Sequence, residues 1–489
     1  MSGIARGTAS GAGAADTGTP GADTAPRTAA GPADPGDRSP FGARLMTPLL
    51  LGAVLNPVNS TMIATALVAI GRAFGVGAAD TAWLVASLYL ASAVAQPTMG
   101  KLADLLGARR VFLAGLLVVV AAGLVGALAP AFGWLIASRV LLGIGTSAAY
   151  PCAMAMLRLR AARLGRQVPR TVLARLSLAS LGSAAVGPVL GGALAATLGW
   201  RAIFAVNIPV ALIGLLLALL WLPRDDGSAA EDREHGAAHS LDPLGIALFA
   251  ATLTVGMLFL MDLAHPEWLL LLPAAALGCA LVWWQLRTPR PFLDLRMLAG
   301  NGPLVRTYAR HGLAYLVIYC VMYGFAQWLE EAHGMSSFHA GLVTLPMSVA
   351  AAVCSLLGAR TKGIAGPLAL AAVVLLAGSG VLLLSGHGTP LPVLLAAAVL
   401  FGLPQGLAGT GNQAAVAAQA PRDGVGAAAG LQRTAQYIGA ITASSLIALC
   451  YGARATDAGL HQVATVTAVL SALLIVLTAT DGALRARGR

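Results

Sequence analysis

Between Met46 and Thr480 the sequence is a succession of long apolar segments separated by short polar connections. A helix needs about 20 predominantly apolar residues to cross the roughly 30 Å hydrocarbon core of a bilayer. Inside lipid a segment must also satisfy its backbone hydrogen bonds within itself, which a helix does. We therefore predict an all-α membrane protein with about fourteen transmembrane spans.

The predicted spans divide around residues 224–241, the most polar internal stretch. Six spans precede it and eight follow, and the last six resemble the first six in length and polarity. This division predicts a six-helix N-terminal bundle (44–223), a cytoplasmic linker (224–241), two additional transmembrane helices (242–290) and a six-helix C-terminal bundle (291–482). We place the spans at about 47–71, 80–100, 110–129, 132–156, 171–198, 202–222, 243–263, 267–286, 304–328, 339–358, 364–386, 391–418, 424–450 and 460–480.

Polar tails are expected at both ends of this membrane region. Residues 1–43 are rich in Gly, Ala, Pro and Thr and cannot bury enough apolar surface to offset chain entropy, so we expect them to be disordered. They lack the short charged region and adjoining apolar run of a signal peptide, so the first helix is expected to stay uncleaved. Residues 483–489 form a short basic tail.

The composition excludes several classes of protein. Only 10% of the residues are charged, whereas a soluble domain has about 25%, so lipid must cover much of the chain. The net charge of +11 comes from scattered residues and not from the clustered basic face that nucleic-acid binding needs. The five cysteines lie in apolar segments without metal-ligand or disulfide spacing, and no P-loop, HExxH or GxSxG motif occurs. We expect no metal, no cofactor and no enzyme activity.

The distribution of Arg and Lys predicts the orientation. Alternate connections carry most of these residues, whereas the connections between them carry only Arg72, Arg201 and Arg454. Because cytoplasmic loops are enriched in Arg and Lys, both termini are expected in the cytoplasm, with the chain in the cell inner (plasma) membrane.

A Gly- and Arg-rich motif follows the second predicted span. Gly100 and Gly107 allow a tight turn and a close approach of neighbouring helices. Asp104 lies at the membrane edge, where it can pair with Arg109, Arg110 or a helix N-terminus in one conformation and separate in another. We expect these five residues to act in gating; a capped turn with positive-inside charges is the alternative.

A second motif, in the fifth predicted span, places small residues around a proline: Gly182, Gly187, Pro188, Gly191 and Gly192. Proline removes a backbone hydrogen bond and bends the helix, and glycines at helical spacing form a groove for close packing. We expect this span to bend at the interface between the two bundles.

These motifs resemble those of the major facilitator superfamily, over nearly all of the chain after the tail. The segment Gly100–Arg110 is similar to its loop signature GxLaDxxGxRR, and Gly182–Gly192 to the GxxxxGPxxGG element of its antiporters. Trp200–Pro209 resembles the WRxxFxxNxP run of the fourteen-span drug:proton antiporter branch, which Pro291–Arg296, Gly341–Pro346 and the two additional spans also fit. The resemblance implies two six-helix bundles around a cavity that opens alternately to each side, and multidrug or antibiotic export driven by inward proton flow.

Ionisable residues inside the predicted spans are candidates for proton coupling, because a charge in lipid is costly. Arg139 matches the family's intramembrane arginine; a structural arginine bonded to carbonyl groups is the alternative. Asp262 and Glu330 lie near outer span ends, where exposed loop charges are the alternative. The first span has Asn59 where this branch usually has Asp, and an amide cannot carry a proton. If protons drive transport, we expect Glu330 to be the carrier.

Polar and aromatic residues inside the spans are candidates for the substrate cavity, with interhelical packing as the alternative. Tyr319 and Trp328 offer further aromatic surface, and His311 is expected to pack. The cavity candidates are Asn59, Thr61, Gln327, Tyr323, Gln405, Asn412 and Gln413.

Taken together, the sequence predicts a secondary active exporter of drug-like or antibiotic small molecules, with protons as the coupling ion and alternating access as the mechanism. A facilitator-type transporter of an endogenous metabolite is the alternative. A membrane sensor would need a soluble effector domain, and neither the tail nor the linker has the composition of one.

Overall fold

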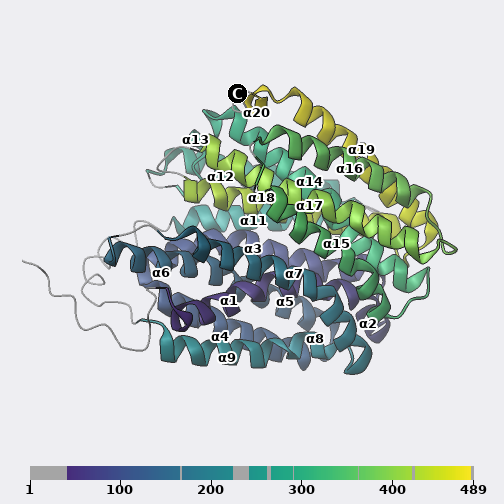
Figure 1. The fold of residues 1–489 in the computed structure, drawn as a ribbon, viewed down its shortest axis with the longest axis horizontal. Coiled ribbons are helices and arrows are strands. Elements are labelled where there is room, and N and C mark those ends of the chain that lie inside the picture. The colour runs from purple at the N-terminus through teal and green to yellow at the C-terminus, as the bar shows by residue number, and fades with distance from the viewer. Residues whose placement is uncertain are drawn as a thin grey trace, which may run out of the picture. The chain divides into compact units, whose positions relative to one another are not determined.

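The computed structural model describes residues 41–165, 168–223, 242–261, 266–289, 291–358, 360–361, 363–420 and 425–485. Every regular element in these ranges is a helix (Figure 1). Residues 1–40 of the predicted tail, the predicted linker and Asp262 lie outside the described residues.

The helices follow the predicted spans closely, and several spans consist of two consecutive helices. The first group is α1 (Ala43–Met62), a 3₁₀ turn η1 (Ile63–Thr65), α2 (Leu67–Phe74), α3 (Ala78–Leu106), α4 (Ala108–Ala127), α5 (Phe132–Ser147), α6 (Ala149–Arg163), α7 (Arg170–Thr197), α8 (Arg201–Ala205) and α9 (Asn207–Trp221). The second is α11 (Pro243–Met261), a 3₁₀ turn η2 (Trp268–Leu270), α12 (Leu271–Arg287), α13 (Leu295–Ala299), α14 (Gly302–Glu331), α15 (Ser337–Gly358), α16 (Ala365–Leu383), α17 (Leu391–Gln419), α18 (Val425–Tyr451), α19 (Asp457–Thr480) and α20 (Gly482–Arg485).

Most of these helices are long and apolar enough to cross a membrane. The described residues contain 12 such spans, or up to 13 if the first helix and α2, which are bent by 60° at their junction, count as one span. An all-helical protein that crosses the membrane many times is therefore confirmed. The predicted total of fourteen also requires α18, a helix of 27 residues that is not among these spans.

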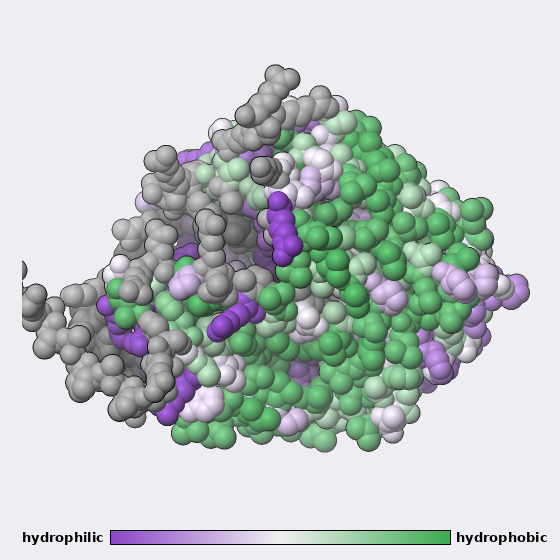
Figure 2. All heavy atoms as spheres, in the orientation of Figure 1, coloured by the Kyte–Doolittle hydropathy of each residue, from purple (hydrophilic) through white to green (hydrophobic). Residues whose placement is uncertain are grey.

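The outer surface of the helices is apolar, as contact with lipid requires. Leu216 on α9, Leu357 on α15 and Val469 on α19 are 56%, 54% and 64% exposed. Figure 2 shows hydrophobic residues over most of the visible described face. Soluble monomers rarely expose continuous apolar patches larger than a few hundred Å², so this surface is suited to a bilayer and not to water.

The helices pack in two groups, which we call the N-half (α1–α9) and the C-half (α14–α19). In Figure 1 the N-half runs from purple to teal and the C-half from teal-green to yellow. Within the N-half α1 packs on α7 and α4 on α5, and within the C-half α15 packs on α17 and α16 on α19. The halves meet chiefly where α3 packs on α18 and α7 on α15, and α11 contacts both α3 and α18.

The two ends of the helix bundle differ. At the terminal end, where α1 begins and α19 ends, Asn301 donates to the Gln419 carbonyl within the C-half. At the opposite, distal end the two halves are joined directly, because the amide of Ala78 donates to the Ala453 carbonyl (3.3 Å) and that of Ala79 to the Gly452 carbonyl (3.0 Å).

Asp242 anchors the two additional helices at the terminal end. Its carboxylate accepts hydrogen bonds from Trp284 Nε1 (2.6 Å), Gln285 Nε2 (3.0 Å), and the amides of Gly245 and Phe292 (both 2.9 Å). Burial alone raises the pKa of Asp242, but these bonds outweigh it and the pKa lies below its usual value. The Asp242 carboxylate thereby joins the start of α11, the end of α12 and the segment after α12.

Candidate functional site

Five tyrosines lie together between the two halves, and we call them the tyrosine cluster. Tyr315, Tyr319 and Tyr323 are four residues apart on α14, so they share one helix face. Tyr89 of α3 lies 5.2 Å from the Tyr319 ring, and Tyr437 of α18 lies 5.6 Å from the Tyr89 ring. The cluster therefore lines the contact between α3, α14 and α18 with amphipathic aromatic surface.

Hydrogen bonds of the tyrosine cluster cross from one half to the other. The hydroxyls of Tyr89 and Tyr323 lie 2.8 Å apart, and Tyr323 donates to the Ser60 carbonyl of α1 (2.7 Å). Tyr437 donates to Gln96 Oε1 of α3 (2.6 Å). Each of these hydrogen bonds links a residue of the N-half to a residue of the C-half. A ligand with polar groups can replace these bonds when the halves separate.

Further polar side chains adjoin the cluster. Gln436 donates to the Tyr319 hydroxyl (2.8 Å), and Arg433 lies within 3.5 Å of Gln436 Oε1. His311 is buried, with its ring 4.6 Å from that of Tyr315 and 3.4 Å from the Gln432 amide, as the packing hypothesis expects.

Arg139 lies inside the N-half. It is 1% exposed and donates from Nε to the Leu84 carbonyl (2.8 Å) and from Nη1 to the Asn59 carbonyl (3.2 Å). Within the part of the chain that the structure describes, its Nη2 has no hydrogen-bond partner. The two bonds from Arg139 to carbonyl groups are those expected of a structural arginine. The Nη2 atom still leaves one donor that another group could use.

Asn59 forms a reciprocal amide pair with Asn207 at the start of α9, and its Nδ2 also donates to the Leu55 carbonyl. Asn207 belongs to the Trp200–Pro209 motif. The Asn59 amide donates one hydrogen bond to Asn207 and accepts one from it. An amide suits this position because it can donate and accept at once. Asn59 is buried in the N-half and does not face the C-half.

Glu330 lies at the distal end of α14 and is 6% exposed. Its Oε2 accepts from the Ser337 hydroxyl (2.7 Å), and its Oε1 has no partner among the described residues. Leaving a carboxylate oxygen buried and unsatisfied is costly unless the group takes up a proton or another partner. The neighbouring Glu331 differs, because its Oε2 accepts from the Ala455 amide (2.5 Å).

The remaining cavity candidates are dispersed through the structure. Thr61 donates to the Pro57 carbonyl, and Asn412 accepts from Arg310 inside the C-half. Gln413 is exposed on α17 and Gln405 is half-buried on the same helix. Gln327 lines a cavity at the distal end. Of the aromatic residues predicted for the cavity, Tyr319 and Tyr323 belong to the tyrosine cluster, whereas Trp328 donates to Asp457 of α19 (2.8 Å).

The small residues of α7 divide between two contacts. A Cβ atom at Gly187 would overlap Thr61, and one at Gly191 would overlap the Met62 carbonyl, both within the N-half. A Cβ atom at Gly192 would instead overlap the Ser337 carbonyl of the C-half. On α15, a Cβ atom at Gly341 would lie only 2.6 Å from the Pro188 carbonyl oxygen, so α7 approaches both halves at backbone distance.

Replacing Gly191 by valine is expected to destabilise this packing. The added atoms meet backbone that cannot move aside, and overpacking of this kind costs about 1–3 kcal/mol. The yield and unfolding temperature of the purified protein measure the effect. Gly182→Val is the matched control, because a Cβ at Gly182 has nothing within 4 Å. Equal stability of the two variants would show that close packing at Gly191 is unimportant.

The segment Gly100–Arg110 spans the α3–α4 junction. Gly107 has φ +97°, which favours glycine, and it joins the two helices directly. Arg109 donates to the Leu219 carbonyl at the end of α9 (3.0 Å). Lys101 donates to the Pro291 carbonyl (3.3 Å), beside the residues that Asp242 holds. Asp104 lies in α3, and its role in gating, like that of Arg110, stays a prediction.

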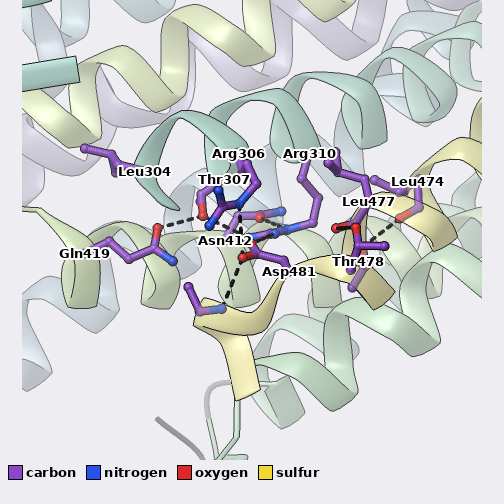
Figure 3. A network of polar contacts seen from close by, with 12 residues as sticks. Leu304, Arg306, Thr307, Arg310, Asn412, Gln419, Leu474, Leu477, Thr478 and Asp481 are labelled. Atoms are coloured by element: carbon purple, nitrogen blue, oxygen red, sulfur yellow. Dashed lines mark hydrogen bonds and ion pairs between the residues drawn. The ribbon is translucent and has the colours of Figure 1, made fainter. Parts of the chain in front are cut away.

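A buried charge network that the sequence did not reveal holds the terminal end of the C-half (Figure 3). Arg310 of α14 points toward Asp481, which follows α19, and Nη1 lies 2.9 Å from Oδ2. Its Nε donates to Asn412 Oδ1 (3.0 Å) and its Nη2 to Thr307 Oγ1 (2.9 Å). Arg306 reaches the other oxygen of Asp481 at 3.2 Å. The network joins α14, α17 and α19.

The family is decided by comparison with known sequences. The profile of the Major Facilitator Superfamily matches residues 49–444, which is most of the chain. The chain belongs to the major facilitator superfamily.

Similar members of this superfamily include bacterial transporters. The uncharacterized MFS-type transporter YwoD of Bacillus subtilis is 33% identical over 427 residues, covering 85% of this chain and 92% of the relative. The multidrug efflux pump LfrA of Mycolicibacterium smegmatis is 27% identical, covering 83% and 80%. The crystal structure of the nucleoside transporter NupG has a TM-score of 0.63 at 12% identity and covers 90% of this chain and 100% of that structure, which establishes the shared fold.

Membership of the major facilitator superfamily confirms the coarse predictions. The protein is a multi-pass membrane transporter and not an enzyme, and its fold is that of the superfamily. The roles of individual residues in gating, proton coupling and substrate contact remain predictions, which the geometry above now locates.

Proposed function

We propose that this superfamily member exports drug-like or antibiotic small molecules from the cell by alternating access, in exchange for protons. The observation that carries the proposal is the tyrosine cluster, a buried aromatic and polar surface shared by the two halves. Drug-like molecules combine apolar area with a few polar groups, which such a surface matches. The name of the relative LfrA, a multidrug efflux pump, supports the same class of substrate.

The proposed topology has fourteen spans, as in the drug:proton antiporter branch, with both termini in the cytoplasm. The packing of α18 supports a count of fourteen. This helix contacts both α3 and α14, which are themselves long and apolar enough to cross the membrane. The terminal end carries Arg109, Arg160 and Arg287, whereas the distal end carries Arg72, Arg201 and Arg454. By the positive-inside rule the terminal end faces the cytoplasm of a bacterial plasma membrane, and the distal end faces outward.

In this topology the described conformation is closed at its outward end. The distal end is joined by the Ala78–Ala453 and Ala79–Gly452 backbone bonds. Toward the terminal end, a Cβ at Gly182 of α7 or at Gly430 of α18 meets nothing within 4 Å. Export then requires the distal bonds to break while the terminal ends of the halves approach.

Everted membrane vesicles with an imposed pH gradient test the proposal directly. Vesicles with and without the protein are offered a panel of fluorescent cationic dyes and antibiotics, and accumulation of at least one compound is expected only where the protein is present. Accumulation of metabolites alone would favour the alternative, a facilitator-type transporter of an endogenous metabolite. The absence of any gradient-driven accumulation would contradict proton antiport.

Replacing Glu330 by glutamine is expected to uncouple export from protons. The amide cannot exchange a proton, whereas the carboxylate has a buried oxygen without a partner in the described chain. We expect accumulation driven by the pH gradient at fixed membrane potential to fall at least tenfold, a change of about 1.4 kcal/mol in coupling, while gradient-independent exchange of substrate continues. Glu331→Gln is the control, since an amide oxygen can still accept from Ala455. An unchanged pH dependence in Glu330→Gln would overturn the assignment.

A further inference from the structure

A cavity of about 300 Å³ lies at the distal end and takes its walls from both halves. The N-half contributes residues of α2 and the start of α3, including Arg72 and Thr81. The C-half contributes Gln327 and Glu331 from the end of α14, and Arg454 from the α18–α19 connection. The volume is at the lower end of the range for sites that bind small molecules.

Gln327 is the feature of this cavity that points to a ligand. The residue is 2% exposed and lines the cavity, yet its amide has no hydrogen-bond partner in the described part of the chain. Its amide faces the space of the cavity, where water or a ligand can take up its hydrogen bonds. Gln327 can offer both a donor and an acceptor, so a polar group that enters the cavity would satisfy it.

The charges around the cavity favour an anion. Arg72 and Arg454 supply two guanidinium groups, and the one acidic side chain in the lining, Glu331, already accepts from the Ala455 amide through Oε2. The charged side chains that line the cavity therefore sum to one positive charge, and Glu330, which is outside the lining, also interacts electrostatically with Arg72. Guanidinium groups bind carboxylates through charge-assisted, often bidentate hydrogen bonds.

The cavity lies where the two halves are joined at the distal end. The bonds from Ala78 to Ala453 and from Ala79 to Gly452 join the two segments that wall it. Separation of the halves at this end would carry Arg72 away from Gln327 and Arg454. A molecule that contacts both walls binds the conformation with a closed distal end more tightly than one with an open distal end. Its binding therefore shifts the population toward the closed conformation, by an amount set by the difference between the two affinities.

We propose that this distal cavity is a regulatory site for a small carboxylate anion, held by Arg72, Gln327 and Arg454, whose binding keeps the distal end closed. The lining includes neither Glu330 nor any member of the tyrosine cluster, although Glu330 interacts electrostatically with Arg72, and the site goes beyond the proposed export function. Its occupant would act as an inhibitor of the conformational cycle and not as cargo.

Binding of succinate to the purified full-length protein in lipid nanodiscs tests the proposal without any transport assay. Titration calorimetry is expected to detect succinate binding, and succinate is expected to raise the unfolding temperature because it binds the folded protein alone. Succinamide, which has neutral amides in place of the carboxylates, is expected to bind at least tenfold more weakly. Equal binding of succinamide would overturn the anionic character of the site, and no binding of succinate would overturn the site itself.

Two variants locate the binding. Gln327→Leu keeps the approximate volume of the side chain and removes the amide, and we expect succinate affinity to fall about tenfold, the equivalent of one hydrogen bond. Arg454→Gln, at an exposed position that tolerates change, is expected to weaken binding by a similar factor. Gln462→Leu, the same substitution at an exposed position of α19, is the control and should bind as the wild type does. Undiminished affinity in both Gln327→Leu and Arg454→Gln would place succinate elsewhere and overturn the proposal.

Discussion

Alanine in place of Arg310 is expected to destabilise the protein by about 3–5 kcal/mol, enough to remove most of the folded material from a purified preparation. The substitution leaves Asp481 without its buried partner, and the side chains of both residues are at most 1% exposed. It also removes the donors to Asn412 and Thr307. Three helices of the C-half then lose the group that joins them.

The neighbouring Arg306 provides the matched control. It contacts the same carboxylate at 3.2 Å, but 46% of its side chain is exposed to solvent. Exposed ion pairs contribute about 0–1 kcal/mol, so Arg306→Ala is expected to change the unfolding temperature little. Similar losses in the two alanine variants would contradict the view that burial of the Arg310–Asp481 pair determines its importance.

The double variant Arg310→Leu/Asp481→Leu separates the cost of an unpaired charge from the value of the pair. A buried ion pair can often be replaced by apolar residues with little loss, because both desolvation penalties disappear together. We therefore expect the double variant to regain much of the stability lost in Arg310→Ala, as measured by yield and thermal unfolding in detergent. Failure to recover would mean that the bonds to Asn412 and Thr307 matter more than the charge balance.

The sequence predicted the helices because the signal for a span is local. Each span is a continuous apolar stretch, so the prediction at about 80–100 corresponds to α3 at Ala78–Leu106. The polar turn at Gly107 was equally visible, since its neighbours form a recognisable motif. The number of spans was harder to predict, because α1 bends at its junction with α2 and α18 mixes apolar and polar residues.

Pairings between distant helices could not be predicted from local signals. Arg310 and Asp481 are 171 residues apart, and Asn59 and Asn207 are 148 apart. Asn412 was a cavity candidate on its residue type alone, yet its partner is Arg310. By contrast, the four-residue spacing of Tyr315, Tyr319 and Tyr323 is enough to predict that they share one helix face.

The other members of the tyrosine cluster required the fold. Tyr89 and Tyr437 come from α3 and α18, and no spacing in the sequence relates them to α14. Similarly, the distal cavity combines Arg72 of α2 with Arg454 of the α18–α19 connection, near opposite ends of the described chain. Sites between the halves are built from residues remote in sequence, so a single sequence identifies their members only one at a time.

A covalent link between Ala78 and Ala453 is expected to stop transport. Cysteines at both positions, in a background without the five native cysteines, are joined by a short bifunctional thiol reagent in intact membranes. The amide of Ala78 lies 3.3 Å from the Ala453 carbonyl, so the pair is within reach of such a reagent. If each cycle opens the distal end, the linked protein cannot complete one. Export of a compound found in the vesicle screen should fall at least tenfold, which a barrier increase of about 1.4 kcal/mol would suffice to cause.

The reversibility of the block distinguishes a trapped conformation from damage, since a reducing agent that cleaves a disulfide-containing linker should restore export. Cysteines at Ser385 and His461 form the matched control pair. These residues are also at the distal end and are joined by a bond from His461 Nε2 to the Ser385 carbonyl (2.7 Å), but both belong to the C-half. Because a rigid half can move as one body, linking them should leave export intact. Full export with Ala78 and Ala453 linked would mean that the halves do not part at this end, and alternating access through the distal opening would then be wrong.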